Sequence, residues 1–147
     1  WLRTMPADET NGIRLLIFFL VTIWIGDSGA YYVGKNLGRH KMAPVLSPKK
    51  TWEGLAGGVA ATFAAAAAFQ SLFPLSFGWP HIFGLAAILS FGAPIGDLIV
   101  SLFKRDTGVK DSSSLIPGHG GLLDRTDSLL FSAPFVLLYL VAAGLIP

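Results

Sequence analysis

Residues 15–34 read LLIFFLVTIWIGDSGAYYVG, and this stretch decides the class of fold. A helix that crosses a bilayer needs about 20 mostly apolar residues. The uninterrupted apolar run at 15–25 is too short to cross alone, so the helix must continue through Gly26, Asp27 and Ser28. Asp27 is therefore predicted to lie inside the membrane, where a carboxylate is costly unless a cation or another polar partner accompanies it.

The rest of the chain contains three more segments of this kind. We predict membrane-spanning helices at residues 14–34, 53–73, 80–103 and 128–146. The second is rich in Ala and Gly, which let helix backbones approach closely and favour a place inside a bundle. The third and fourth contain Pro94 and Pro134, and we expect each proline to kink its helix. The predicted fold is all-α, a polytopic integral membrane protein with about four transmembrane helices.

The composition points to the same class. Hydrophobic residues make up 52% of the 147 residues and charged residues 14%, against roughly 25% charged in an average soluble domain. The mean hydropathy of +0.60 is too high for a small domain that must cover its surface with polar groups. The chain has no cysteine, which excludes disulfides, thiolate nucleophiles and cysteine-bound metals. Any metal must therefore bind to oxygen or imidazole.

The basic residues predict an orientation. Nine of the 11 Lys and Arg residues fall in the loops at 35–52 and 104–127, whereas the intervening loop PLSFGWP has none. Basic residues in short loops mark the cytoplasmic side, so both basic loops are predicted to be cytoplasmic and both chain ends external. Residues 1–13 are then a stub outside the membrane. Because the chain starts at Trp1 and soon enters a span, we expect it to be the C-terminal part of a longer membrane protein.

Four aspartates are predicted to lie at one depth. At 1.5 Å per helical residue, Asp27 and Asp97 lie roughly 20 and 24 Å from the outer edge, in the cytoplasmic third of the membrane. Asp124 and Asp127 precede the last apolar run, three residues apart on one helix face. Carboxylates gathered at one level call for cations. Two simpler interpretations stay open: the second pair could cap a helix, and the first pair could bind basic residues or relay protons.

The long loop at 104–127 adds groups that suit phosphates. It reads KRDTGVKDSSSLIPGHGGLLDRTD, without helical periodicity. Its cations and its glycines suit anion binding: Lys104, Arg105, Lys110, His119, Arg125, Gly118, Gly120 and Gly121. Asp97 and Ser101 share a helix face with Lys104 or Arg105. Carboxylates beside such cations indicate a metal–nucleotide site.

Some of these groups also allow a simpler interpretation. In the first loop, Lys49 and Lys50 of LSPKKTWEG are candidates to bind another phosphate or to anchor the chain at anionic headgroups. His119 is either an acid catalyst or a solvated or capping residue.

Residues 101–127, SLFKRDTGVKDSSSLIPGHGGLLDRTD, resemble the signature of the phosphatidate cytidylyltransferases, or CDP-diacylglycerol synthases. The matching pattern is Ser, two residues, Lys-Arg, four residues, Lys-Asp, then Pro-x-His-Gly-Gly and Asp-Arg-x-Asp. The segments at 26–41, GDSGAYYVGKNLGRHK, and at 46–58, LSPKKTWEGLAGG, also resemble this family, in the expected order. Members of the family are commonly nearly twice as long, so the chain is similar to their C-terminal catalytic half, and residues 14–147 would be the catalytic domain.

The resemblance implies a reaction in which phosphatidic acid attacks the α-phosphorus of CTP to give CDP-diacylglycerol and pyrophosphate. It also implies Mg²⁺, with a second, monovalent cation such as K⁺ left open, and a bacterial inner membrane with the active site facing the cytoplasm. The implied partners are CTP, phosphatidic acid and the lipid bilayer, without nucleic acid, and a homodimer stays open.

The resemblance further implies roles for particular residues. The metal ligands, also catalytic, would be Asp97, Asp124 and Asp127. The other catalytic residues would be Lys104, Arg105 and His119. The substrate-binding candidates are Asp27, Ser47, Lys49, Lys50, Ser101, Lys110, Asp111, Gly120, Gly121 and Arg125. The alternatives are a CTP-dependent lipid kinase, another lipid cytidylyltransferase and, from another class, an ion-coupled transporter.

Overall fold

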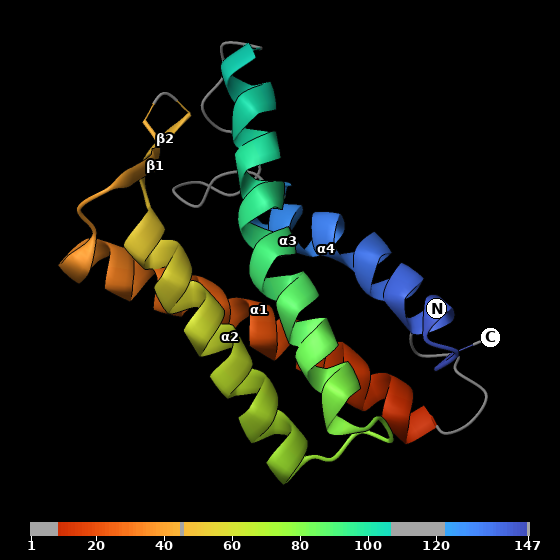
Figure 1. Cartoon of the computed structure of the whole chain (residues 1–147). Helices are drawn as coiled ribbons and strands as arrows, with labels where there is room; N and C mark the ends of the chain where they lie inside the picture. The colour runs from red at the N-terminus through yellow and green to blue at the C-terminus, as the bar shows by residue number, and fades with distance from the viewer. Residues whose placement is uncertain (1–8, 45, 107–122, 147) are drawn as a thin grey trace.

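The computed structural model describes residues 9–44, 46–106 and 123–146. In the described part, four helices and one short hairpin follow each other along the chain (Figure 1). Their bounds are α1 Glu9–Leu37, β1 Lys41–Ala43, β2 Ser47–Thr51, α2 Trp52–Leu72, α3 Trp79–Asp106 and α4 Leu123–Ala142. The predicted all-α class and the four helices are confirmed.

The helix bounds differ from the predicted ranges mainly at the ends. α1 begins earlier than residue 14 and continues to Leu37, α3 runs on to Asp106, and α4 begins ahead of residue 128. Polar residues at these ends still form helical hydrogen bonds, which the hydropathy of a span does not reveal. Pro94 and Pro134 lie inside α3 and α4.

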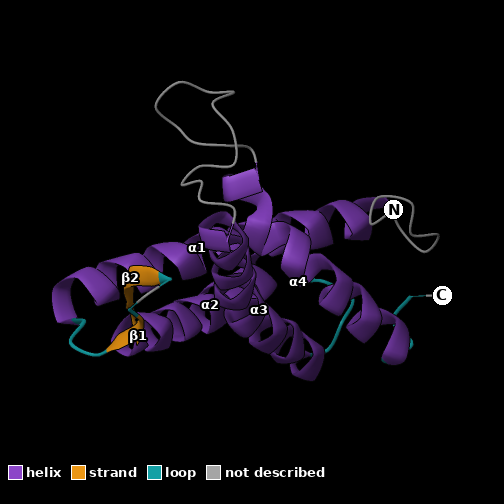
Figure 2. Cartoon of the chain, turned by 90° about the horizontal axis from the view of Figure 1, so that it is seen from above, coloured by secondary structure: helices purple, strands orange, loops and turns teal. Residues whose placement is uncertain are grey.

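Part of the first predicted loop folds into an antiparallel β-hairpin. β1 and β2 pair through Lys41 with Thr51 and through Ala43 with Ser47, with an irregularity between these pairs. Each strand has only one partner, so β2 tolerates Pro48, which has no N–H to donate. Figure 2 shows the hairpin beside the adjoining ends of α1 and α2.

Among the described residues, three helices are long and apolar enough to cross a membrane: α1 over Asn11–Leu37, α2 and α3. The apolar part of α4 that can be described, Ser128–Ala142, is shorter than a full span. The first three predicted spans therefore match helices of suitable length and composition. The fourth span stays a prediction.

Small residues bring α1 and α2 together. Gly26 and Ala30 of α1 face Gly58 and Thr62 of α2: a Cβ added to Gly26 would lie 2.3 Å from Thr62 Oγ1, and one added to Gly58 would lie 3.0 Å from Ala30 Cβ. The two backbones are too close for larger side chains, as in membrane helices that associate through small residues. The prediction that the Ala- and Gly-rich second span faces the bundle is confirmed.

We expect Gly57→Val to destabilise the bundle by about 1–3 kcal/mol, because a Cβ at this position would lie 2.5 Å from Val33 Cβ and must push α1 away. The free energy of unfolding of the purified protein in mixed detergent micelles measures the effect. Gly78→Val is the control, since its Cβ would meet only Pro80 Cδ, at 3.6 Å. Equal stability of the two variants would contradict the close α1–α2 packing.

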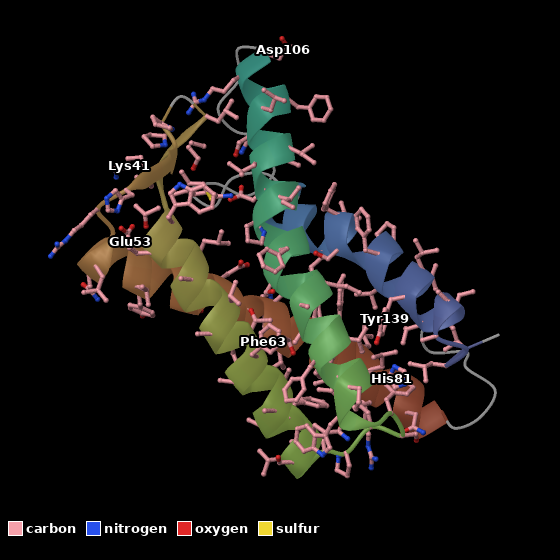
Figure 3. The ribbon with its side chains drawn as sticks, in the orientation of Figure 1. Lys41, Glu53, Phe63, His81, Asp106 and Tyr139 are labelled. Atoms are coloured by element: carbon pink, nitrogen blue, oxygen red, sulfur yellow. The ribbon has the colours of Figure 1, made fainter. Side chains whose placement is uncertain are left out.

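α4 packs against α3 in the antiparallel direction. Ser128 Oγ donates a hydrogen bond to the carbonyl oxygen of Ala93 at 3.4 Å. Near the other end of α4, the Tyr139 hydroxyl lies 3.2 Å from Nδ1 of His81, close to the start of α3 (Figure 3). Ser128 thus contacts Ala93, whereas Tyr139, later in α4, contacts His81, which is earlier in α3. The turn of α4 that precedes Ser128 therefore continues toward the part of α3 that follows Ala93.

The core draws on all four helices, since Ala66 and Phe69 of α2 join the buried side chains of α1, α3 and α4. Its most deeply buried large side chains belong to α1, α3 and α4: Leu15, Phe18, Ile82, Leu85, Leu89 and Leu140. This core and the α1–α2 contact hold the helices together. The predicted site residues of these helices lie farther along α1 and α3 and near the start of α4.

Candidate functional site

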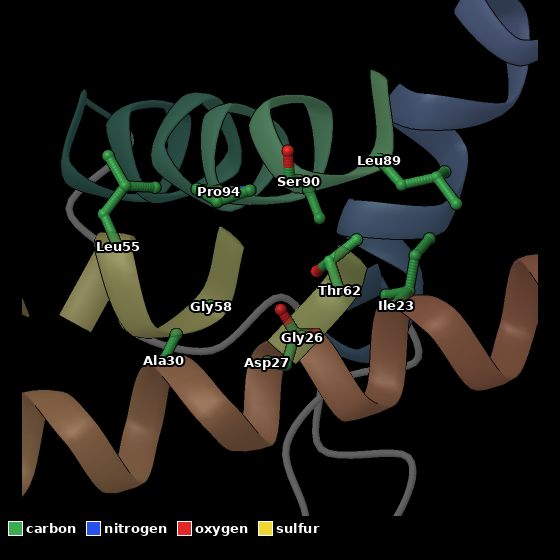
Figure 4. A pocket seen from close by; sticks show the side chains of 11 residues that line it. Ile23, Gly26, Asp27, Ala30, Leu55, Gly58, Thr62, Leu89, Ser90 and Pro94 are labelled. Atoms are coloured by element: carbon green, nitrogen blue, oxygen red, sulfur yellow. The ribbon is translucent and has the colours of Figure 1, made fainter. Parts of the chain in front are cut away.

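A pocket lies between α1, α2 and α3 and is bordered by Asp27. The space among its lining residues is about 270 Å³, and this volume includes the part that opens to the surroundings (Figure 4). The lining residues are Ile23, Gly26, Asp27, Ala30, Leu55, Gly58, Thr62, Leu89, Ser90, Ala93 and Pro94. Most of the lining is apolar, with one carboxylate and the hydroxyls of Thr62 and Ser90. Gly26 and Gly58 let α1 and α2 meet closely on one side of this pocket, since a Cβ on Gly26 would lie against Thr62 Oγ1.

Lys50 and Asp97 form an ion pair next to this pocket. Lys50 Nζ lies 2.7 Å from Asp97 Oδ2 and donates a second hydrogen bond, of 3.1 Å, to the carbonyl oxygen of Pro94, which lines the pocket. The Lys50 side chain is 20% exposed and that of Asp97 is 41% exposed. The carboxylate of Asp97 is therefore accessible to a ligand while it holds a cationic group.

The hairpin that carries Lys50 is fastened at its base. Thr51 is buried and caps α2, because its Oγ1 accepts a hydrogen bond from the N–H of Gly54 at 3.1 Å. The Glu53 carboxylate accepts hydrogen bonds from the backbone N–H groups of Arg39 and His40, and His40 Nδ1 lies against Glu53 Oε1. These contacts hold the turn after α1 against the first residues of α2. They therefore determine the position of β2 and of Lys50.

The predicted residues on α1 and α3 lie partly as expected. Asp27 borders the pocket, and its side chain is exposed on the surface of the described residues. Asp97, Ser101 and Lys104 are each partly buried, Arg105 is exposed, and the shared face of α3 stays a prediction. On β2, Ser47 is partly buried and Lys49 is exposed.

Other predicted residues cannot be placed in full. Six lie outside the described residues: Lys110, Asp111, Gly118, His119, Gly120 and Gly121. The backbones of Asp124, Arg125 and Asp127 lie in the first turns of α4, and their side chains are outside the described part. Asp124 precedes Ser128 by one turn, on the stretch of α4 that continues toward the part of α3 that contains Asp97.

The carboxylates predicted for this region have the donor chemistry that a hard divalent cation requires. Among the described side chains, no group of three Asp, Glu, His or Cys residues is close enough to hold a metal. The ammonium group of Lys50 nevertheless binds the carboxylate of Asp97, so this carboxylate already holds a positively charged group. Carboxylate oxygens are the ligands that Mg²⁺ prefers, and Asp97 together with Asp124 and Asp127 would supply them.

Sequence reasoning missed the residues that hold the hairpin. The Thr-x-x-Gly pattern from Thr51 to Gly54 at the start of an apolar helix is a recognisable capping signal. Glu53 gives no such signal, because its partners Arg39 and His40 lie in another segment. Thr62 and Ser90 were missed as pocket residues because isolated hydroxyls in an apolar run are common in membrane helices.

Comparison with known proteins gives consistent matches. The model of the family described as "Cytidylyltransferase family" matches residues 2–143. A protein named phosphatidate cytidylyltransferase from Bacillus subtilis (strain 168) is 43% identical over 128 residues, which are 87% of this chain and 48% of that protein. Proteins of the same name from Brucella suis biovar 1 and Haemophilus influenzae are each 44% identical, over 97% and 87% of this chain and 52% and 46% of their own lengths. The chain thus spans about half the length of the curated relatives it matches.

Proposed function

This chain belongs to the cytidylyltransferase family, and we propose that it carries the catalytic site of a phosphatidate cytidylyltransferase. The reaction would transfer CMP from CTP to phosphatidic acid and yield CDP-diacylglycerol and pyrophosphate. The observation that carries the proposal is the Lys50–Asp97 pair beside a mostly apolar pocket. It supports the proposal because an ammonium group and a carboxylate, which are suited to bind phosphates and cations, lie beside a mostly apolar lining that would suit a lipid.

The residues on α3 and β2 suit nucleotidyl transfer. A phosphate oxygen of phosphatidic acid forms the new bond to the α-phosphorus of CTP while the bond to the β-phosphate oxygen breaks. The nucleophile is already an anion, so the step needs positioning and charge neutralisation more than a strong base. Lys50, Lys104 and Arg105 would orient the phosphates and stabilise the leaving pyrophosphate.

A divalent cation, for which we propose Mg²⁺, would neutralise charge on the phosphates when bound. Asp97, Asp124 and Asp127 would hold it, with Asp27 close by, and a monovalent cation such as K⁺ would fit the remaining carboxylate charge. Carboxylates near the cytoplasmic end of the spans would let the lipid enter the site from the bilayer and CTP enter it from water.

We expect label from α-³²P-CTP to enter the lipid fraction when phosphatidic acid and Mg²⁺ are supplied to the complete protein. Label from γ-³²P-CTP should stay in water as pyrophosphate, because attack at the α-phosphorus releases the β- and γ-phosphates together. Thin-layer chromatography of the lipid extract measures both. γ-Label in the lipid with CDP left in water would instead place the protein among the lipid kinases.

We further propose that the site faces the cytoplasm across a bacterial inner membrane, since the basic loops lie at this end of the helices. Cysteines introduced as Asn36→Cys and Ser76→Cys in this cysteine-free chain should react with an impermeant thiol reagent from opposite sides. Both residues are exposed. A cysteine at Ser113 should behave like the one at Asn36. Labelling of positions 36 and 76 from the same side would contradict the proposed orientation.

A further inference from the structure

Lys50 reaches across from the hairpin to α3, and the polar contacts that it makes with described residues are on that helix. Its ammonium group binds the Asp97 carboxylate at 2.7 Å and the Pro94 carbonyl oxygen at 3.1 Å. The Lys50 side chain is only 20% exposed, so its contacts hold it in position, unlike a lysine that extends into solvent. Asp97 keeps 41% exposure, which leaves room for a second ligand on the same carboxylate.

The neighbouring Lys49 shows that this placement is specific. Side chains alternate between the two faces of a strand, and in β2 Lys49 is exposed while Lys50 is partly buried. The two residues have the same charge, the same length and adjacent positions. They therefore form a matched pair in which Lys50 contacts Asp97 and Lys49 is exposed.

We propose that Lys50 is an exchangeable internal counter-ion, which occupies Asp97 until a divalent cation binds there and releases the ammonium group toward the anionic substrate. This inference rests on the proposed function, since it takes Asp97 as a ligand of the divalent cation. Two cations on one carboxylate repel each other strongly, so binding of the dication weakens the lysine contact. The released ammonium group then lies next to the site as a phosphate ligand.

The contacts around Lys50 allow this exchange without moving the hairpin. Thr51 and Glu53 hold the backbone on both sides of Trp52, through the cap of α2 and through the N–H groups of Arg39 and His40. The lysine side chain has a flexible four-carbon stem, so rotation within it is enough to move the ammonium group. The exchange is therefore a change of side-chain conformation at a fixed strand.

The first test measures the affinity of the complete protein for Mg²⁺ alone by calorimetry, in detergent and without nucleotide or lipid. Lys50→Met removes the competing charge and keeps most of the side-chain stem. We therefore expect Mg²⁺ to bind about tenfold more tightly, which corresponds to about 1.4 kcal/mol of binding free energy. Lys49→Met should leave the affinity unchanged. An unchanged or weaker affinity in Lys50→Met would overturn the proposal.

A second test uses the unmodified protein and so does not depend on how the variant folds. Lysines are acylated with a water-soluble amine reagent, and the rate at each site is measured by mass spectrometry with and without Mg²⁺. Lys50 should react at least about fivefold faster with Mg²⁺, because its ammonium group leaves Asp97. Lys49 should react equally in both conditions. Equal rates at Lys50 would overturn the proposal.

Neither test involves turnover, so their outcomes separate the two proposals. Tighter Mg²⁺ binding in Lys50→Met with no transfer of α-label to lipid would support the counter-ion and reject the cytidylyltransferase. Normal transfer of label with unchanged Mg²⁺ affinity and unchanged Lys50 reactivity would support the cytidylyltransferase and reject the counter-ion.

Discussion

Asp97→Asn is expected to lower kcat/KM for cytidylyl transfer about a thousandfold, because a carboxylate that holds a catalytic cation contributes several kcal/mol to transition-state stabilisation. The amide has the same shape but no charge. It therefore loses the charge that attracts Lys50, whose Nζ lies 2.7 Å from Asp97 Oδ2, and it would also lose the charge proposed to bind Mg²⁺. Steady-state assays with CTP and phosphatidic acid measure the loss.

Asp106→Asn is the matched control for this prediction. It makes the same change on the same helix, at an exposed position at the end of α3. Its kcat/KM should stay within about twofold of the unmodified protein, as for most exposed substitutions. If Asp97→Asn retained near-normal activity at ordinary Mg²⁺ concentration, Asp97 would be a structural partner of Lys50 and no more.

Asp127→Asn and Asp124→Asn are expected to cause losses of similar size, about a hundredfold or more. α4 begins at Leu123, so both residues lie in its first turns, one turn or less ahead of Ser128, which contacts α3. Carboxylates at these positions would complete the ligands around Asp97. The measurement is again kcat/KM, together with its dependence on Mg²⁺ concentration.

The same substitutions separate metal binding from helix capping. Asn caps a helix about as well as Asp, so a residue that only caps would tolerate the change with little loss of stability or activity. A metal ligand would lose activity while the thermal unfolding of the protein stayed the same. Full activity in Asp127→Asn would remove that residue from the proposed metal site; Asp127 is the fifth residue of α4, so capping does not explain it.

The sequence alone determined the elements that depend on local pattern. Long apolar segments predicted the helices, because a membrane span requires a continuous apolar surface whatever its neighbours are. The Gly- and Ala-rich second span indicated close packing, since small side chains are what permits it. The motif at 101–127 indicated the family, because it keeps the residue types that bind phosphates and cations in a fixed order.

Only the tertiary structure decided which residues meet. Lys50 was a candidate for a phosphate or a headgroup and Asp97 for a metal, and nothing in their local sequences pairs them across 47 positions. The pairing depends on a hairpin that begins where α1 ends and is fastened by Glu53 to that turn. Such contacts follow from how α1, α2 and α3 pack, because the distance between residues far apart in sequence depends on every element between them.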